Sequence, residues 1–511
     1  MVGSEESRRR WPWLAAIAAA VLLAAAVAGA GWHYSSDVVV PDHSGGSYDL
    51  EILAVSPDGV TLPRTAATER PGTFALEWEG GRAILGPVVD PAAGGDDPAA
   101  PAGDPDAAAE DEVVRRTREV EGSLTEGAPA RLDSYVFAGN PLSSRGLAYR
   151  DVEVPGELGP MPAWQIGPDN APTWALIVHG RNGDPTGGLR IAPALRDAGL
   201  TSLLITYRND EGVPPSPDGK LHMGLTEWRD LEAAAKYALA HGALRLVVVG
   251  SSMGGAIVTQ FLERSRLAPR AAAMILDAPA LDWPAAIAKG AREMGLPSVA
   301  AKPVEWAVGL RIDADWEQLD ALRHTDQLTL PTLLFHGTED DVVPIETSDE
   351  FAAALPESVT YHRVPAAGHI QSWNVDPTLY ATRVEAFLRR TVGSAAPAGE
   401  RPAGSPDGAS SGAEPAPGGA PGAAPPGTDI STEDSQFGEV IFDGDGQAIY
   451  YFDLEQTSEP ECYGSCAAAW PPVLTEGEPR ASGDARQRLL GTTERRDGTT
   501  QVTYDGRPLY Y

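Results

Sequence analysis

Cysteine and positive charge are both scarce in this sequence of 511 residues. Its two cysteines, Cys462 and Cys466, lie near the C-terminus, so no metal cluster of the zinc-finger type is available. Lysine and arginine number 39 against 72 aspartates and glutamates, which gives a formal net charge of −33. This charge argues against nucleic acid or an anionic membrane surface as a partner of the folded parts. We interpret the acidity as a strongly solvated surface of a kind suited to high salt, and an acidic patch that binds cationic substrates is the alternative.

Charge is also missing from Trp11 to Trp32, a run rich in Ala, Val and Leu that is long enough to cross a bilayer. The arginines at 8–10 precede this run and would hold that end in the cytoplasm. We therefore predict a single retained span in the cell membrane, with the remaining chain outside the cytoplasm. A cleaved signal peptide, which Ala28-Gly29-Ala30 would fit, predicts a secreted protein instead, and a buried soluble helix is the third alternative.

Breaks in composition divide the chain, whose 511 residues are enough for two or three domains and whose hydrophobic fraction of 42% can fill at least one large core. The predicted parts are a cytoplasmic tail and span (1–32), a strand-rich accessory region with a disordered acidic insertion at 91–111 (33–148), a catalytic domain (149–391), an Ala/Gly/Pro linker (392–427) and a small β-rich domain (428–511).

The catalytic region alternates short apolar runs with helical stretches. The apolar runs are Trp174–Val178, Leu203–Tyr207, Leu244–Val249, Ala272–Leu276 and Thr332–Phe335. Continuous apolar strands separated by helices indicate a doubly wound α/β fold with a mostly parallel sheet covered on both faces. Ligands of such sheets bind beyond the carboxyl ends of the strands.

The alternation of strands and helices is interrupted between Pro279 and Leu328. The segment there is mostly helical and contains Trp283, Met294, Trp306 and Trp316. Apolar residues at helical spacing predict core positions. An inserted block at this point of the chain is alternatively a cap over the active site.

One strand, Leu244–Val249, leads into Gly250-Ser-Ser-Met-Gly, the Gly-x-Ser-x-Gly pattern of a nucleophile elbow with Ser252 at its centre. A serine hydroxyl is a poor nucleophile at neutral pH, so the elbow implies a base and a group that orients this base. Asp340 follows the strand that ends at His336, and His369 follows a later strand. The order Ser, Asp, His is the one expected of this architecture.

Residues 149–391 resemble the α/β-hydrolases through Gly250-Ser-Ser-Met-Gly, His336-Gly-x-x-Asp340-x-x-Val-Pro and Gly368-His369. The resemblance implies that Ser252 is the nucleophile, that His369 is the general base and acid, and that Asp340 fixes the tautomer of the imidazole.

The same resemblance implies an oxyanion hole made by the backbone N–H groups of Met253 and Arg181. Arg181 and Asn182 stand where lipases with a glycine-rich run have glycines. Asp277, which follows the strand after the elbow helix, is the alternative acid because some hydrolases use that position. His179 and His336 are predicted to form hydrogen bonds with the backbone and to shape their turns.

The last part of the chain resembles the secreted lipoprotein repeats named for a Tyr-x4-Asp motif. The resemblance is carried by Tyr450-Tyr-Phe-Asp-Leu-Glu, Cys462-Tyr-Gly-Ser-Cys466, Ala469-Trp-Pro-Pro and Asp505-Gly-Arg-Pro-Leu-Tyr-Tyr. Phe442–Tyr451 and Tyr504–Tyr511 also form an internal half-repeat typical of hairpins. In an exported protein the cysteine pair most simply forms a short-range disulfide.

The sequence thus predicts an exported or membrane-anchored serine hydrolase that cleaves an ester or related acyl bond of a small substrate through an acyl-enzyme, without metal or cofactor. A serine peptidase of the same fold is the first alternative, although no pattern establishes the acidic pocket that an aminopeptidase needs. The second alternative is a cell-surface binding protein that uses the fold as a scaffold. The C-terminal domain is a candidate for contact with the cell envelope.

Overall fold

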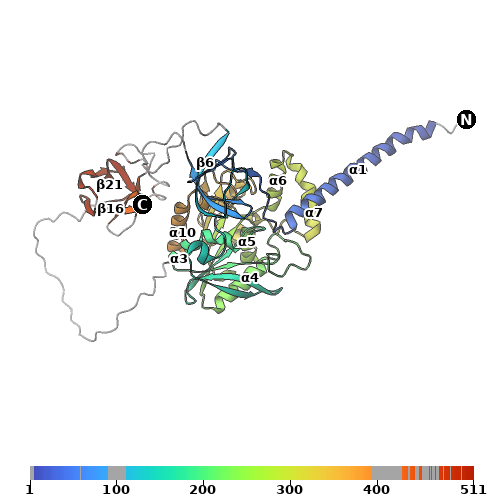
Figure 1. Ribbon diagram of the computed structural model, residues 1–511. Helices are drawn as coiled ribbons and strands as arrows, with labels where there is room; N and C mark the ends of the chain where they lie inside the picture. The colour runs from blue at the N-terminus through green and yellow to red at the C-terminus, as the bar shows by residue number, and fades with distance from the viewer. Residues whose placement is uncertain are drawn as a thin grey trace, which may run out of the picture. The chain divides into compact units, whose positions relative to one another are not determined.

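The structure is a computed structural model that describes residues 5–57, 59–89, 111–393 and much of 428–511 (Figure 1). The predicted disordered insertion, apart from Asp111, and nearly all of the predicted linker lie outside the described residues. The chain divides into two compact units, Met1–Arg401 and Pro402–Tyr511, and each is described by itself.

The predicted span lies within one long helix, α1 (Glu5–Val39). Its segment Ala16–Val39 is long and apolar enough to cross a membrane and is almost entirely exposed. A membrane span and an N-terminal signal sequence both have these properties. The last turns differ from the rest of α1, because Ser35 and Val39 are fully buried and pack beside α7 (Lys302–Ile312).

The accessory region forms an antiparallel sheet of seven strands in the order β1-β7-β4-β5-β6-β3-β2. The strands are β1 (Leu50–Glu51), β2 (Ala54–Ser56), β3 (Gly59–Pro63), β4 (Phe74–Trp78), β5 (Gly81–Val88), β6 (Glu112–Glu121) and β7 (Pro129–Asp133). Ile52, Leu62, Leu76 and Leu85 are fully buried in a small core of their own. A short helix, α2 (Pro141–Arg145), leads from this sheet into the catalytic region.

The catalytic region contains an eight-stranded mixed sheet in the order β15-β14-β13-β12-β10-β11-β9-β8. The strands are β8 (Tyr149–Pro155), β9 (Pro160–Ile166), β10 (Thr173–Val178), β11 (Thr201–Ile205), β12 (Arg245–Ser251), β13 (Ala271–Asp277), β14 (Thr332–Gly337) and β15 (Val359–Val364). The six strands from β10 to β15 are parallel, whereas β9 pairs antiparallel with both β8 and β11. This mixed sheet fits the predicted α/β-hydrolase fold.

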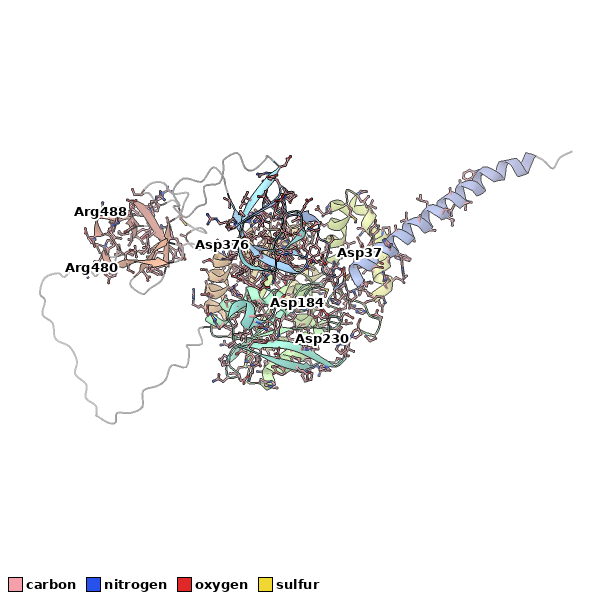
Figure 2. All side chains as sticks on the ribbon, viewed as in Figure 1. Asp37, Asp184, Asp230, Asp376, Arg480 and Arg488 are labelled. Carbon is pink, nitrogen blue, oxygen red and sulfur yellow. The ribbon has the colours of Figure 1, made fainter. Side chains whose placement is uncertain are left out.

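Helices cover both faces of the sheet, as the continuous apolar strands predict. Besides α7, the helices of this region are α3 (Ala192–Asp197), α4 (Trp228–Ala240), α5 (Met253–Arg264), α6 (Trp283–Glu293), α8 (Ile345–Ala354), α9 (Ser372–Val375) and α10 (Pro377–Thr391), whose N-cap is Asp376 (Figure 2). In β10, Leu176 and Val178 belong to the core under α4 and α5, whereas Ala175 and Ile177 belong to the core under α3 and α10. The alternation follows from the period of two along a strand.

The inserted helical segment is α6 (Trp283–Glu293), a 3-10 turn (Ser298–Ala301) and α7. Trp283 is buried as predicted, but Met294 is 57% exposed and Trp306 is 59% exposed, so the prediction of core positions is wrong for these two. The reason lies in the packing of α7, which buries Ala307 and Val308 and leaves Trp306 on its outer side. Figure 1 shows α6 and α7 beside the inner end of α1.

The C-terminal unit is a small β-rich unit with a seven-stranded sheet in the order β19-β16-β17-β18-β22-β21-β20. Its strands are β16 (Asp429–Ser435), β17 (Gly438–Asp443), β18 (Ala448–Tyr451), β19 (Arg480–Gly483), β20 (Leu490–Glu494), β21 (Thr500–Tyr504) and β22 (Arg507–Tyr510). The half-repeat forms the hairpins β17–β18 and β21–β22, whose second strands pair with each other. Cys462 is buried and disulfide-bonded, and Cys466 lies outside the described residues.

Candidate active site

Ser252 occupies a tight turn between β12 and α5. Its backbone has φ 52° and ψ −120°, a conformation that residues other than glycine rarely adopt and that often occurs at functional sites. A Cβ atom at Gly250 would lie 2.5 Å from the carbonyl oxygen of Gly254, and one at Gly254 would lie 2.2 Å from that of Val178. Both positions therefore require glycine, as the elbow pattern predicts.

The structure brings the three predicted residues together at the carboxyl ends of the strands. Ser252 Oγ lies 2.8 Å from His369 Nε2, and His369 Nδ1 lies 2.8 Å from Asp340 Oδ2. Because a carboxylate only accepts hydrogen bonds, Nδ1–H donates to Asp340, which leaves Nε2 as the acceptor for the serine hydroxyl. His369 comes from the loop after β15, and Asp340 comes from the loop after β14.

Asp340 has more partners than the sequence suggested. Its Oδ1 atom accepts hydrogen bonds from the backbone N–H groups of Val342 and Val343, each at 2.8 Å. His336 Nε2 lies 3.2 Å from Oδ2, so two imidazoles contact one carboxylate. Burial by itself would raise the pKa of Asp340, but the hydrogen bonds from His336 and His369 outweigh it and hold this pKa well below its usual range.

The sequence did not lead us to predict the contact between His336 and Asp340. The two residues are four positions apart around the end of a strand, and this spacing could have indicated the contact. The ring of His336 is fully buried, and its Nδ1 atom lies 2.7 Å from Ser348 Oγ. Its Nε2 atom also lies 3.3 Å from the carbonyl oxygen of Val343, which is the backbone contact that was predicted.

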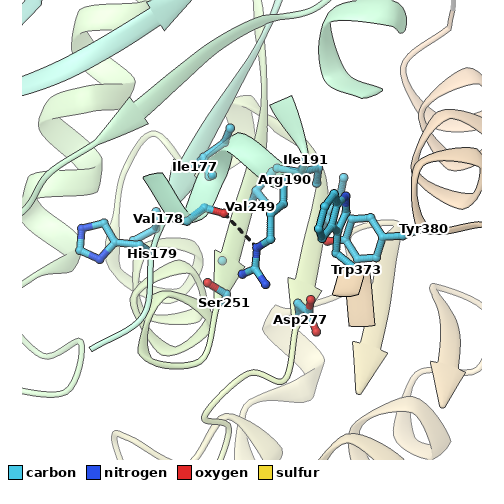
Figure 3. Close-up of a pocket in the computed structure, with 14 residues that line it drawn as sticks. Ile177, Val178, His179, Arg190, Ile191, Val249, Ser251, Asp277, Trp373 and Tyr380 are labelled. Atoms are coloured by element: carbon cyan, nitrogen blue, oxygen red, sulfur yellow. Dashed lines mark hydrogen bonds between the residues drawn. The ribbon is translucent and has the colours of Figure 1, made fainter. Parts of the chain in front are cut away.

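Asp277, the alternative acid, is placed differently. Its carboxylate accepts a hydrogen bond from Ser372 Oγ at 2.8 Å, whereas the described contacts of His369 Nδ1 are with Asp340. Burial raises the pKa of Asp277, and the nearby Arg190 opposes this shift. Figure 3 shows Arg190 and Asp277 lining a cavity together with Trp373 and Tyr380. The geometry therefore favours Asp340 as the residue that orients His369.

The two predicted oxyanion donors flank Ser252. Met253 is the first residue of α5, where backbone N–H groups point away from the helix and attract negative charge. The turn that contains Arg181 also lies beside Ser252, because a Cβ atom at Gly180 would lie 3.1 Å from Ser252 Cβ. Within the described part of the chain, neither the Met253 nor the Arg181 amide N–H has a hydrogen-bond acceptor.

A buried cluster holds this turn in place. The carbonyl oxygen of Gly180 lies 2.9 Å from His179 Nδ1 and accepts a hydrogen bond from Tyr207 Oη at 2.8 Å. His179 Nε2 lies 3.0 Å from Asp210 Oδ2. Burial by itself would lower the pKa of His179, but Asp210 and the Gly180 carbonyl outweigh it and raise this pKa. His179 thus shapes its turn as predicted, while the parts of Tyr207 and Asp210 were not foreseen.

The accessory region supports the segment that carries His369. Asn374 Nδ2 donates hydrogen bonds to the carbonyl oxygens of Thr73 (2.8 Å) and Ser134 (2.9 Å), and Thr73 N–H donates to the Asn374 carbonyl at 2.8 Å. Arg70 donates a hydrogen bond to Gln371 Oε1 at 3.2 Å. These contacts fix the position of the chain just after His369, and no local sequence pattern predicted them.

Two family matches cover parts of the chain. The prolyl oligopeptidase family (Peptidase_S9) matches residues 185–395, and a domain of unknown function (DUF8805) matches residues 51–133 of the accessory region. An uncharacterized protein of Mycobacterium tuberculosis (strain H37Rv) is 26% identical over 219 residues, which are 42% of this chain and 69% of that protein.

The chain is also similar to solved structures. An esterase of Pyrococcus furiosus is 21% identical and has a TM-score of 0.40, and the match covers 50% of this chain and 98% of the esterase. A proline iminopeptidase-related protein of Thermus thermophilus is 19% identical and has a TM-score of 0.38, covering 48% of this chain and all of that one. The family match and the mixed sheet support an α/β-hydrolase fold and a serine hydrolase.

Within the described residues, no group of three or more His, Cys, Asp or Glu side chains is arranged to hold a metal ion.

Proposed function

We propose that this protein is a membrane-anchored serine hydrolase that cleaves a carboxylic ester through an acyl-enzyme on Ser252. One observation carries the proposal, namely the unbroken hydrogen-bond chain from Ser252 Oγ through His369 to Asp340, with 2.8 Å at each step. A nucleophile, a base and an orienting acid in this arrangement are the parts that acyl transfer needs.

In the first half of the reaction, Ser252 Oγ attacks the carbonyl carbon of the ester while His369 Nε2 takes the hydroxyl proton. The carbonyl oxygen becomes an oxyanion, which the N–H groups of Met253 and Arg181 stabilise. Removing one such donor from another serine hydrolase lowers kcat about 10²–10³-fold. His369 then returns the proton to the departing alkoxide, so that an alcohol leaves and the acyl group stays on Ser252.

In the second half, a water molecule replaces the alcohol. His369 Nε2 takes a proton from this water, the resulting hydroxide attacks the acyl carbon, and Ser252 leaves as its hydroxyl after recovering the proton from His369. Asp340 stays ionised throughout, because hydrogen bonds from both histidines hold its pKa well below the usual range despite its burial. Its charge stabilises the imidazolium that forms in each half.

A serine peptidase is the second candidate, because the matched family is that of prolyl oligopeptidase. An aminopeptidase needs a carboxylate that is available to the ammonium group of its substrate. Three carboxylates around the site already have partners, since Asp340 contacts two histidines, Asp210 contacts His179 and Asp277 contacts a serine hydroxyl. This pairing supports the ester over the substrate of an aminopeptidase.

The proposal is tested with Ser252→Ala and with Ser251→Ala as the matched control in the same turn. Ser252→Ala should abolish labelling by a fluorophosphonate probe and hydrolysis of p-nitrophenyl esters, whereas Ser251→Ala should retain both. Undiminished labelling of Ser252→Ala would overturn the proposal. A panel of esters, thioesters and aminoacyl amides compares the two candidates, and faster cleavage of the amides would favour the peptidase.

A further inference from the structure

Exposed apolar side chains concentrate on the inserted helical segment. Between residues 40 and 393, the described part of the chain has twelve large hydrophobic side chains that are exposed, and five of them fall within 294–310. These five, which we call the cap face, are Met294 (57%), Leu296 (45%), Val299 (70%), Trp306 (59%) and Leu310 (63%). Trp306 and Leu310 are four residues apart on α7 and therefore share one side of the helix. Such a concentration of apolar surface marks an interaction site.

The cap face lacks the negative charge that dominates the whole chain. With the capping residues of α6 and α7 included, residues 282–313 have no net charge, because four basic residues balance four acidic ones, namely Lys289, Arg292, Lys302 and Arg311 against Asp282, Glu293, Glu305 and Asp313. The whole chain has a net charge of −33. A segment without net charge that exposes tryptophan and aliphatic side chains can lie on a bilayer with these side chains at the acyl boundary beneath the headgroups.

The cap face is attached to the end of the apolar helix. A Cβ atom at Gly31 would lie 2.5 Å from the carbonyl oxygen of Pro303, so α1 and α7 approach each other closely. Arg311 donates hydrogen bonds to the hydroxyl groups of Ser35 and Ser36, both at 2.8 Å, and its guanidinium lies 5.1 Å from the ring centre of Trp32. The position of α7 is therefore fixed relative to the last turns of α1.

The spacing of tryptophans along α1 places this junction at the edge of a bilayer. Trp13 and Trp32 are both exposed, and the helical rise between them is about 28 Å, close to the roughly 30 Å of a hydrocarbon core. Tryptophan side chains prefer the two interfaces of a membrane. If α1 crosses the bilayer between them, α7 lies at the level of the headgroups.

The last turn of α1 and the chain that leaves it contact the turn beside the candidate active site. The carbonyl oxygen of Asp37 accepts a hydrogen bond from the Arg181 guanidinium, and Asp42 N–H donates to Asn182 Oδ1 at 3.1 Å. Both partners belong to the turn that follows His179 and Gly180 beside Ser252. The end of the span, the cap face and the oxyanion turn are thus neighbours in one packed unit.

We propose that the cap face docks onto the bilayer that α1 crosses and that the active site takes its substrate, an amphiphilic ester, from that leaflet. The inference that the cap face docks rests on its exposed apolar surface, on its lack of net charge and on its attachment to α1. The statement about the substrate rests in addition on the proposed function. Docking places the oxyanion turn at the membrane surface, where the acyl chain of a lipid-like ester can reach Ser252 without crossing water.

Docking is tested on the full chain reconstituted in nanodiscs of phosphatidylcholine and phosphatidylglycerol. Leu310→Cys and Leu244→Cys form a matched pair, because both leucines are 63% exposed and Leu244 lies before β12, at the opposite end of this strand from Ser252. Each variant receives a nitroxide spin label. We expect the label at 310 to be about tenfold less accessible to a water-soluble nickel complex than the label at 244, and readily accessible to oxygen dissolved in the bilayer.

Two outcomes would overturn docking. Equal nickel accessibility at 310 and 244 would show that the cap face is in water. Protection of 310 from both nickel and oxygen would show that protein, such as a second copy of this chain, covers the face instead of lipid.

The substrate is tested with Leu310→Asp and Leu244→Asp. Leu310→Asp should lower the hydrolysis of a long-chain p-nitrophenyl ester embedded in the nanodiscs about tenfold and leave a short water-soluble ester unaffected, because a buried carboxylate opposes docking. Leu244→Asp should change neither rate. If both variants cleave the embedded ester at equal rates, the proposal of an amphiphilic substrate is overturned. Failure of the parent protein to cleave either ester would instead refute the proposed function, while the spin-label comparison would still decide docking.

Discussion

Asp340→Asn changes one property of the site and preserves most of its shape. The asparagine side chain has the same size, and its oxygen can still accept the hydrogen bonds from the N–H groups of Val342 and Val343. Its NH2 group then faces His369 Nδ1 and cannot accept a proton from it. The imidazole therefore adopts the tautomer with its proton on Nε2, which cannot take the proton of Ser252.

The size of the effect follows from this change of tautomer. In related triads the same substitution lowers kcat about 10⁴-fold, which corresponds to roughly 5.5 kcal/mol of transition-state stabilisation. Asp277→Asn should lower kcat/KM less than about tenfold, because the amide oxygen keeps the hydrogen bond from Ser372. Burial raises the pKa of Asp277, because a buried carboxylate is costlier than a neutral side chain.

The assay is kcat/KM on a soluble p-nitrophenyl ester for the parent protein and both variants, with thermal unfolding as the test of an intact fold. A loss for Asp277→Asn equal to or greater than that for Asp340→Asn would refute the assignment of the acid. A nearly unchanged kcat/KM for Asp340→Asn in a folded protein would refute the tautomer argument itself.

Three further predictions follow from other parts of the catalytic unit. Gly72→Ala should lower both activity and the unfolding temperature far more than Gly80→Ala. Both glycines have positive φ, but only at Gly72 would a Cβ atom collide with the Asn374 carbonyl oxygen, at 2.0 Å. Equal effects of the two variants would show that the contact between Gly72 and Asn374 is unimportant for the position of His369. The raised pKa of His179, where Asp210 outweighs burial, stabilises the fold fully below about pH 6.5 and progressively less as the pH rises through the folded value. His179→Gln should remove this decline in unfolding temperature between neutral and alkaline pH, and an unchanged slope would contradict it. If α1 is retained, the membrane fraction should contain the intact chain of 53.7 kDa, and a soluble product that begins near Gly31 would show cleavage instead.

The candidate triad was accessible from the sequence because each of its residues follows a recognisable strand. Parallel strands have their carboxyl ends at one edge of a sheet, so Ser252, Asp340 and His369 were expected to converge there. The glycines of the elbow were equally visible, because the pattern states where side chains would collide. The positions come from local patterns combined with one rule of topology, and this is why the geometry could be anticipated without any knowledge of loop packing.

The supports of the triad were not accessible in the same way. Asn374 and Thr73 are 301 residues apart, and their contact depends on how the accessory sheet packs on the catalytic region. The antiparallel pair β8 and β9 was not predicted, because four of the seven residues of Tyr149–Pro155 are exposed and the segment lacks the continuous apolar pattern of the inner strands. Trp306 shows the converse error, because helical spacing reports an apolar stripe but not whether protein or lipid covers it.

Arg181 and Asn182 connect these observations. In the sequence they are departures from a glycine-rich turn, yet the proposed oxyanion donor at this position is a backbone N–H, which any residue other than proline supplies. Their side chains are therefore available for other contacts, and they bind the backbone of Asp37 in the last turn of α1 and of Asp42 in the segment that follows α1. A glycine at either position would keep the backbone N–H group but lose the side-chain contact with the end of α1 or the segment after it. The two residues therefore fit the proposal of a hydrolase whose oxyanion turn is held at the end of α1.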